Sequence, residues 1–208
     1  SINEIAEYGD IMVSALPSQV LRSVLGEFPS GYKNQVVSVS KGIENNTGKR
    51  MSQVILETLN LDLEEIVILS GPSHAEEVSQ KYPTTVVAAC SDIDLARKVQ
   101  ELFSNQYFRV YSGKDVIGVE IGGSAKNIIA ISAGICHGLG YGDNTMAALV
   151  TRGLEEIIRL GTTLGAHRST FSGLSGMGDL VATAFSPHSR NKQVGERIGK
   201  GEKLSDIL

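Results

Sequence analysis

Short apolar segments alternate with helical patterns through the first half of the chain, and the alternation stops near Lys114. The segments rich in valine and isoleucine are expected to be strands: Asp10–Leu16, Gln35–Ser40, Glu65–Ser70, Thr84–Cys90 and Tyr107–Tyr111. Helical patterns lie between several of them: Ser18–Gly26, Thr47–Leu59 and Ser91–Phe103, the last with a start capped by Ser91 and Asp94. Strands that alternate with helices build βαβ units and a largely parallel sheet with right-handed crossovers. The first half is therefore expected to be an α/β domain.

No strand pattern returns in the second half. The helical stretches expected there are Val116–Leu139, a second helix capped by Asp143 or Asn144, and a third that begins after Ser189. The first of these is rich in glycine and alanine, and an interruption is expected near Gly134 or Gly138. The expected fold class is α/β: a Rossmann-like parallel-sheet domain over residues 1–113, followed by an all-α domain over residues 114–208.

Lys126 is the only formal charge between Ile121 and Gly142, in a segment whose isoleucines must be buried. Burial removes water from an ammonium group, which favours the neutral form and lowers the pKa. An amine poised between its two charge states suits a proton transfer or a Schiff base. The alternative is a lysine whose stem covers apolar surface while its ammonium reaches water. The sequence of this segment alone favours the second interpretation.

Other polar residues follow expected strands or begin expected helices. Lys41 follows a strand end, where ligands bind in open α/β sheets, although this motif alone favours a loop lysine before a turn glycine. Ser73 and Glu76 have the spacing of a capping box. The same helix start could receive a phosphate or carboxylate, and Gly71 would let a ligand approach the backbone. Each motif alone is compatible with a purely structural role.

The C-terminal quarter adds a carboxylate, a hydroxyl and a guanidinium. Asp179 follows a glycine-rich turn, and Thr183, four residues later, lies on the same helical face. Together they could hydrogen-bond a hydroxylated substrate. Arg190 begins a helix at Ser189-Arg190-Asn191, and arginine binds phosphate oxygens bidentately. The alternatives are a helix-start aspartate and an exposed arginine in a cap.

Composition excludes several classes of function. A net charge of −4 without a cluster of lysine and arginine argues against a nucleic-acid partner. Cys90 and Cys136 lack a CxxC spacing, so reduced thiols are expected rather than a disulfide or a metal site. No signal peptide and no apolar run long enough to span a bilayer are found. A cytoplasmic protein without membrane insertion is expected.

The glycine fingerprint of a dinucleotide-binding domain, Gly-x-Gly-x-x-Gly after a first strand, does not precede the first expected strand. The C-terminal residues Lys203–Leu208 have the pattern of an unfinished helix. The sequence is therefore expected to be an internal portion of a larger enzyme, incomplete at both ends.

The motifs occur in a characteristic order: Ser40-Lys41-Gly42, Ser70-Gly71-Pro72-Ser73, Val119–Asn127, Gly142-Asp143-Asn144, Thr151–Glu155, Gly173–Leu180 and Ser189-Arg190-Asn191. In this order they closely resemble bacterial-type NAD(P)-dependent sn-glycerol-3-phosphate dehydrogenases, over essentially the whole chain. The resemblance implies hydride transfer between glycerol 3-phosphate and dihydroxyacetone phosphate, feeding phospholipid synthesis. It implies NAD or NADP as cofactor and a small phosphorylated substrate, and it allows a homodimer.

The resemblance also implies residue roles. Lys126 matches the proton acceptor and donor at the C2 oxygen, and Lys41 matches a second lysine near substrate and nicotinamide. The further positions that match substrate contacts are Gly71, Ser73, Asn127, Asp179, Thr183, Ser189, Arg190 and Asn191, the last three at the phosphate end. Cofactor contacts match Lys41, Ala75 and Arg190. No metal is implied.

Two other functions stay open at this point. One is a related two-domain dehydrogenase that acts on another phosphorylated or acidic hydroxy compound. The other is a non-catalytic fragment that serves as a scaffold or dimerisation module, because the glycine fingerprint is missing from this sequence. Turnover of different oxo compounds and binding of NADH would separate these functions.

Overall fold

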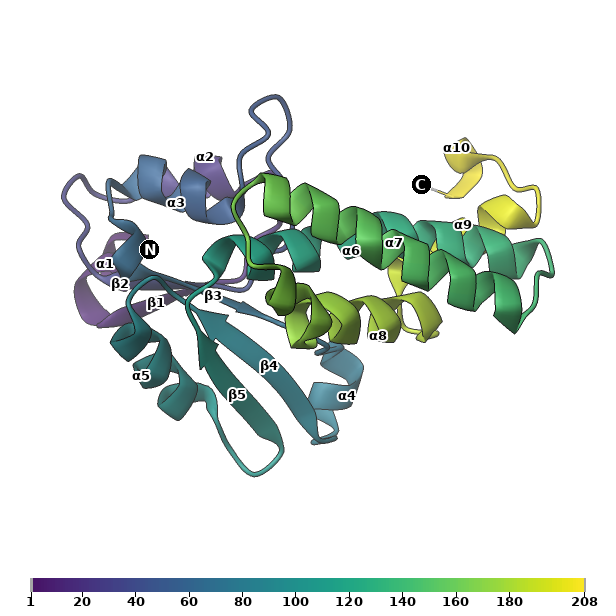
Figure 1. The fold of residues 1–208 in the computed structure, drawn as a ribbon. Helices are drawn as coiled ribbons and strands as arrows, with labels where there is room; N and C mark the ends of the chain where they lie inside the picture. Colours follow the sequence, from purple (N-terminus) through teal and green to yellow (C-terminus); the bar gives the residue numbers. More distant parts are fainter. Residues whose placement is uncertain (1, 208) are drawn as a thin grey trace.

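The structure is a computed structural model that describes residues 2–207 and joins a sheet-containing half to a helical half (Figure 1). The strands are β1 (Ile11–Ser14), β2 (Gln35–Ser38), β3 (Ile66–Ser70), β4 (Thr84–Ala89) and β5 (Phe108–Gly113). The helices of the first half are α1 (Ile2–Tyr8), α2 (Leu21–Leu25), α3 (Met51–Leu59), α4 (Ala75–Ser79) and α5 (Ile93–Phe103). Those of the second half are α6 (Val116–Gly138), α7 (Asp143–Thr163), α8 (Asp179–Phe185), α9 (Arg190–Gly199) and α10 (Leu204–Ile207).

The strands form one sheet in the order β1-β2-β3-β4-β5. β1, β2 and β3 are parallel, β4 runs antiparallel to β3, and β5 is parallel to β4. The prediction of a Rossmann-like, largely parallel sheet followed by a helical part is confirmed, and the antiparallel β3–β4 pair is the exception. The carboxyl ends of β1, β2 and β3 consequently share one edge of the sheet.

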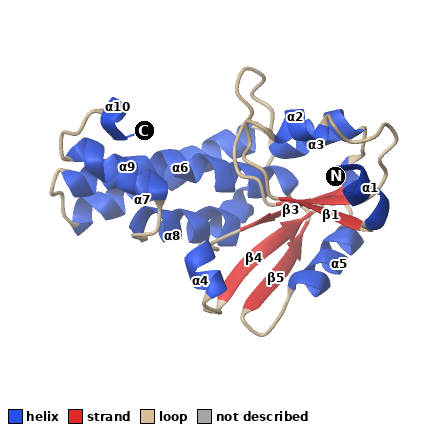
Figure 2. Cartoon of the chain, turned by 180° about the vertical axis from the view of Figure 1, so that it is seen from behind, coloured by secondary structure: helices blue, strands red, loops and turns tan. Residues whose placement is uncertain are grey.

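Helices cover both faces of the sheet, which Figures 1 and 2 show from opposite sides. α2 and α3 bury Leu21 and Ile55 against one face. On the opposite face α5 buries Leu95 and Val99. Fully burying such a side chain stabilises the fold by about 1.5–3 kcal/mol. These two layers hold the strand ends, and the loops that follow them, in fixed positions.

α6 is the central helix of the second half and packs against α7, α8 and α9. Its 23 residues run without a break through Gly134 to Gly138, so the interruption expected there is wrong. The reason is packing, because α9 covers both glycines. A Cβ atom on Gly134 would overlap the carbonyl oxygen of Lys192, and one on Gly138 would overlap that of Glu196.

α9 lies alongside α6 and runs in the same direction. A Cβ atom on Gly195 would overlap the carbonyl oxygen of Ile131, and one on Gly199 would overlap that of Ile135. Backbones approach this closely only where side chains are absent. The register places the start of α9 beside the turn of α6 that contains Asn127.

Several local expectations differ from the structure. The helix expected from Thr47 begins at Met51, because Ile43 and Arg50 form an antiparallel bridge around a tight turn with Gly48 at φ +68°. α5 is capped by the side chain of Asp92, which accepts from Asp94 N, and not by Ser91. Helix α1 was not expected. The division into residues 1–113 and 114–208 stays a prediction, although the last strand ends at Gly113.

α6 is also the one helix within residues 2–207 that is long and apolar enough, by length and composition, to cross a membrane. The expectation that no such run exists is therefore wrong on those criteria. However, 61% of this apolar stretch of α6 is buried inside the structure, as in the core helix of a folded protein.

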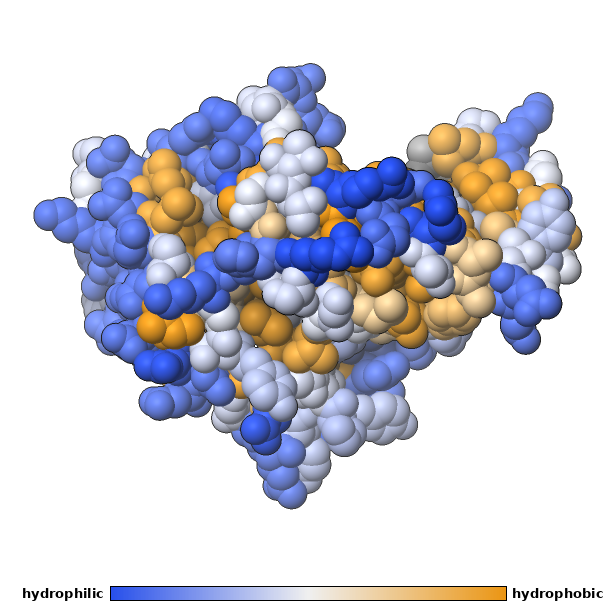
Figure 3. All heavy atoms as spheres, in the orientation of Figure 1, coloured by the Kyte–Doolittle hydropathy of each residue, from blue (hydrophilic) through white to orange (hydrophobic). Residues whose placement is uncertain are grey.

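Apolar side chains remain exposed in the helical half. Ile128 on α6, Leu139 just beyond it and Leu204 on α10 are each more than half exposed. Figure 3 shows apolar surface over the end of the helical half that carries α9 and α10. Within the described residues this end of the molecule is therefore not covered.

Gly195→Ala tests the packing of α9 on α6. We expect the added methyl to lower the free energy of unfolding by about 1–3 kcal/mol, because it must displace the backbone of α6. The control is Gly113→Ala, whose methyl would meet only the Val87 side chain at 3.7 Å and should change stability by less than about 0.5 kcal/mol. Urea unfolding measures both, and equal stability of the two variants would contradict the described register.

Candidate active site

Lys126 lies inside the junction between the two halves, and its side chain is 8% exposed. Its Nζ donates to one carboxylate oxygen of Asp179 and, at 2.7 Å, to Thr183 Oγ1. The Thr183 hydroxyl gives its own proton to the carbonyl oxygen of Asp179 at 2.6 Å. It can therefore only accept from Lys126. The interpretation of Lys126 as a lysine that reaches water is excluded by this geometry.

Lys41 approaches the same carboxylate from the sheet. Its Nζ donates to Asp179 Oδ2 at 2.7 Å and to the carbonyl oxygen of Gly71 at 3.2 Å. The side chain of Lys41 is 27% exposed, whereas that of Asp179 is 3% exposed. Asp179 thus lies between two lysines, with Lys126 on the inner side and Lys41 on the outer side.

The local sequence explains how Asp179 reaches this position. The preceding residues, Leu174–Gly178, form a single π-helical turn that continues into α8. Gly122 of α6 lies against this turn, and a Cβ atom there would overlap the carbonyl oxygen of Ser175. The predicted spacing of Asp179 and Thr183 on one helical face is confirmed, since both contact Lys126.

Burial, assisted by the charge of Lys41 and opposed by Asp179, lowers the pKa of Lys126 to about 8. The lowered pKa expected from the apolar surroundings is thus confirmed in direction, and so is the contribution of Lys41. A lysine with this pKa exchanges its proton near neutral pH, which an ordinary lysine does not.

This arrangement is suited to acid–base chemistry. Two of the three positions around Lys126 Nζ are taken by Asp179 and Thr183. The remaining position can hold a proton or a lone pair for a bound molecule. Asp179 compensates the charge of the protonated state, so the amine can alternate between its forms without leaving its partners.

The segment after β3 supplies the next predicted positions. Gly71 has φ +151°, and a Cβ atom there would meet Val86 Cα at 2.9 Å, so only glycine fits. Ser73 is exposed and its Oγ donates to the Gly71 carbonyl oxygen at 3.2 Å. The capping box expected from Ser73 and Glu76 is absent, because His74 is the N-cap of α4.

The predicted phosphate-end residues begin α9. Ser189 is buried, and its Oγ accepts from Lys192 N at 3.2 Å. Arg190 is exposed and Asn191 is half-buried. The register of α9 brings them to the level of half-buried Asn127. The roles of Ser189, Arg190 and Asn191 at the phosphate end stay predictions.

A cavity lies beside Lys41, at the carboxyl side of the sheet. It has a volume of about 230 Å³, and its lining is Val39, Lys41, Leu69, Ser73, Ala75, Val78, Val86 and Phe108. The lining combines an apolar slot with Lys41 and Ala75, the residues predicted to contact cofactor. At the carboxyl ends of β1 and β3 the hydroxyls of Ser14 and Ser70 are buried without a partner, which suits a polar ligand. No cluster that could hold a metal ion is found among the described residues.

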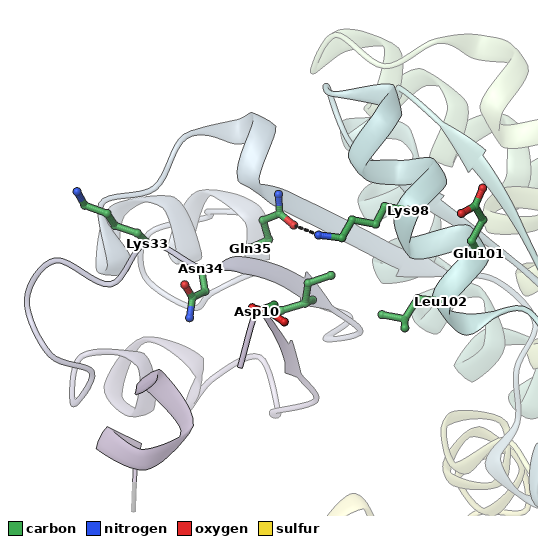
Figure 4. Close-up of a pocket in the computed structure, with 8 residues that line it drawn as sticks. Asp10, Lys33, Asn34, Gln35, Lys98, Glu101 and Leu102 are labelled. Carbon is green, nitrogen blue, oxygen red and sulfur yellow. Dashed lines mark hydrogen bonds between the residues drawn. The ribbon is translucent and has the colours of Figure 1, made fainter. Parts of the chain in front are cut away.

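A larger hollow of about 940 Å³ lies elsewhere, between the start of β1 and α5 (Figure 4). It is lined by Asp10, Gln35 and Lys98, among others, and Gln35 accepts a hydrogen bond from Lys98 at 3.3 Å. Asp10 and Gln35 stand at the amino ends of β1 and β2. Ligands in open α/β sheets bind at the carboxyl ends, so this hollow is remote from the candidate site.

Sequence reasoning assigned no role to two features near the site. Glu120 of α6 is buried and pairs with Arg50, which lies 70 positions earlier in the chain. A carboxylate in an apolar helix was the available signal. His74 and His188 lie with ring centroids 6.3 Å apart, at the starts of α4 and α9. Nothing in the sequence pairs those two histidines.

Two family models match the chain. The model of the NAD-dependent glycerol-3-phosphate dehydrogenase N-terminus matches residues 1–96. The model of the C-terminus of the same family matches residues 115–208. Together they cover both the sheet-containing half and the helical half.

Curated relatives carry the same name. The glycerol-3-phosphate dehydrogenase (NAD(P)+) of Lysinibacillus sphaericus is 53% identical over 210 residues, which cover 100% of this chain and 62% of the relative. That of Prosthecochloris aestuarii is 54% identical over 211 residues, covering 100% of this chain and 63% of the relative. The chain therefore spans less than two thirds of the length of these relatives.

Solved structures share the fold. The crystal structure of the glycerol-3-phosphate dehydrogenase of Coxiella burnetii superposes with a TM-score of 0.86 at 35% identity, covering 95% of this chain and 60% of that one. The enzyme of Saccharomyces cerevisiae superposes with a TM-score of 0.85 at 28% identity, covering 100% of this chain and 62% of that one. The arrangement of sheet and helices is therefore common to these proteins.

Lys41→Met tests the electrostatics of the site. Removal of a like charge makes protonation of Lys126 easier, so we expect the pKa of Lys126 to rise above about 8. Competitive acetylation across a pH series, read by peptide mass spectrometry, follows Lys126 individually. Lys33→Met, which removes an exposed lysine, is the control. An unchanged midpoint in Lys41→Met would contradict the proximity of the two ammonium groups.

Proposed function

The chain belongs to the NAD-dependent glycerol-3-phosphate dehydrogenase family, and we propose that it forms the central part of an enzyme that interconverts sn-glycerol 3-phosphate and dihydroxyacetone phosphate. One observation carries the proposal: the buried amine of Lys126, held by Asp179 and Thr183 beside the carboxyl edge of the sheet. An amine in this setting is what oxidation of a secondary alcohol requires.

In the oxidative direction, neutral Lys126 accepts the proton of the C2 hydroxyl while the hydrogen on C2 leaves as hydride. A bound nicotinamide cofactor supplies the chemistry of hydride transfer. In the reverse direction the Lys126 ammonium protonates the oxygen of the former ketone as an alkoxide develops on it. General acid–base catalysis of this kind contributes about 10²–10⁴-fold to the rate.

Asp179 and Thr183 orient Lys126 in both directions, because their acceptor atoms occupy two of its three positions. Lys41 lies at the outer oxygen of Asp179, from where its ammonium stabilises negative charge on the substrate oxygen. It also keeps the pKa of Lys126 low. The two lysines therefore have different tasks although they share one carboxylate.

The phosphate group of the substrate is assigned to the start of α9. Arg190 is free of competing ion pairs within residues 2–207, and its guanidinium can bind a phosphate bidentately. The N–H groups at a helix start add to such a site. Ser189 and Asn191, together with Asn127 on α6, complete this side of the substrate. Gly71 and Ser73 line the opposite side.

Lys41, Ala75 and Arg190 are assigned to the cofactor, which is NAD or NADP. The cavity beside Lys41 supports this assignment for the nicotinamide end. The glycine fingerprint that holds a pyrophosphate does not occur in residues 1–208. The choice between NAD and NADP depends on an acidic or basic residue after the second strand of such a domain, and none is assigned to that role in residues 1–208. A role in glycerophospholipid synthesis, a cytoplasmic location and a homodimer are further parts of the proposal.

Lys126→Ala is the principal test. We expect kcat for dihydroxyacetone phosphate reduction to fall by about 10²–10⁴-fold, with the fold retained by circular dichroism. NADH absorbance is followed for the chain itself and for a chimera that adds the segments of the Lysinibacillus sphaericus relative that lie outside its match to this chain. Lys33→Ala is the matched control. Near-normal kcat in Lys126→Ala would overturn the assignment.

The same chimera separates the alternatives. Preference for another oxo compound over dihydroxyacetone phosphate would indicate a related dehydrogenase. Failure of the chimera to bind NADH, measured by fluorescence titration, would indicate a non-catalytic module.

The pH dependence of the two directions should be opposite. Oxidation requires neutral Lys126, so kcat/KM for glycerol 3-phosphate should rise with pH through a midpoint near 8, the pKa of the folded state. Reduction requires the ammonium form, so kcat/KM for dihydroxyacetone phosphate should fall through the same region. Initial rates from about pH 6 to 10 measure both, and parallel profiles would contradict the acid–base role.

A further inference from the structure

A buried ion pair connects α6 to the start of α3, outside the candidate site. The side chain of Glu120 is 3% exposed, and that of Arg50 is 14% exposed. Arg50 Nη1 donates to Glu120 Oε2, and the Ser52 hydroxyl donates to the same oxygen at 2.7 Å. The other oxygen accepts from Ser52 N at 2.7 Å. Both oxygens of this carboxylate therefore have partners.

The position of these partners is informative. Ser52 is the second residue of α3, so its N–H is one of the donors that a helix start leaves unpaired. A carboxylate placed there also interacts favourably with the helix dipole. Glu120 thus belongs to α6 by sequence but completes the N-terminus of α3. The two helices lie on different sides of the junction between sheet and helical halves.

Stability alone does not explain a buried ion pair. Apolar residues of similar volume are often as good, whereas a charged pair specifies one arrangement of the elements it joins. The rotation of α6 about its axis needs to be specified next to the site, because the surface of α6 at Gly122 and Gly123 is bare backbone. Bare backbone permits close approach but adds no interlocking side chain at this turn, so Glu120 supplements the orientation that buried side chains such as Val119 and Ile121 give to α6.

Lys126 depends on that rotation. Six residues separate it from Glu120, which is about 9 Å along the helix and about 240° around it. A rotation of about 30° moves a side-chain atom about 5 Å from the axis by about 2.6 Å. The hydrogen bond from Lys126 Nζ to Thr183 Oγ1, 2.7 Å long, would be lost.

We infer that Glu120 is a positioning residue: its ion pair with Arg50 and its bonds to Ser52 fix the rotation of α6, and thereby hold the Lys126 amine between Asp179 and Thr183. The inference concerns the placement of Lys126 and stands independently of which substrate is turned over.

The test reads Lys126 directly, in the chain as it exists. Competitive acetylation gives its titration midpoint, and urea unfolding is measured in parallel. The groups that face the amine are Lys41 and Asp179, with the neutral hydroxyl of Thr183. If the Lys126 side chain is released into water, it loses both the burial that lowers its pKa and the Asp179 charge that raises it. Burial has the larger effect, so the titration midpoint of Lys126 should move upward.

Glu120→Gln removes the charge with little change of shape, and Glu120→Gln with Arg50→Met leaves no charge unpaired. In both variants we expect a folded chain whose Lys126 midpoint is higher by at least about one pH unit, which corresponds to an about fivefold smaller neutral fraction at about pH 8. Arg50→Lys keeps the positive charge opposite Glu120, so the titration midpoint of Lys126 should stay close to that of the wild type.

Glu44→Gln is the matched control, because it breaks the Arg22–Glu44 ion pair on the same side of the sheet but outside α6. It should leave the midpoint unchanged. An unchanged midpoint in both Glu120 variants would overturn the inference. So would a double variant that fails to fold, since the pair would then be required for stability and not for position.

Discussion

The Asp179 carboxylate is the interaction on which the rest of the site depends. It joins a lysine that follows a strand, Lys41, to a lysine inside a helix, Lys126. Without an anion between them, two ammonium groups in a poorly hydrated junction would repel each other. One carboxylate therefore connects the sheet to the helical half and limits how far burial and Lys41 lower the pKa of the inner lysine. Structure and chemistry share the same contact.

The glycine-rich surfaces of α6 and α9 have a complementary function. They place backbones so close together that the start of α9 and the middle of α6 face the same space. Side chains from different parts of the sequence then project into that space without long loops. The consequence is a site assembled from rigid elements, with the sheet end, α6, α8 and α9 each contributing a few groups.

Much of this was predictable from sequence because it depends on local pattern. The period of apolar residues indicated the strands and helices. The isolation of Lys126 in an apolar segment raised burial with a lowered pKa as one of two interpretations, although the segment alone favoured the other. The spacing of Asp179 and Thr183 indicated a shared helical face. What the pattern could not show depends on distant partners. The continuity of α6 through Gly134 depends on α9, and the burial of Glu120 depends on Arg50, 70 positions away. The start of α4 at His74 follows a bend at Gly71, where the backbone passes close to Val86 of β4.

The antiparallel pairing of β3 with β4 has a consequence for the length of α6. Gly113, the last residue of β5, pairs with Ala89, which pairs in turn with Ile68 of β3. The chain therefore leaves the sheet level with Ile68, two residues before the carboxyl end of β3, and α6 runs back along the strand direction to reach that edge. From Val116 to Lys126 the helix advances about 15 Å, close to the length of a five-residue strand. One residue inserted into this stretch would shift the amine by about 1.5 Å and turn it by about 100°. A change in the length of this stretch would therefore misplace the reactive lysine even where the residues themselves are unchanged.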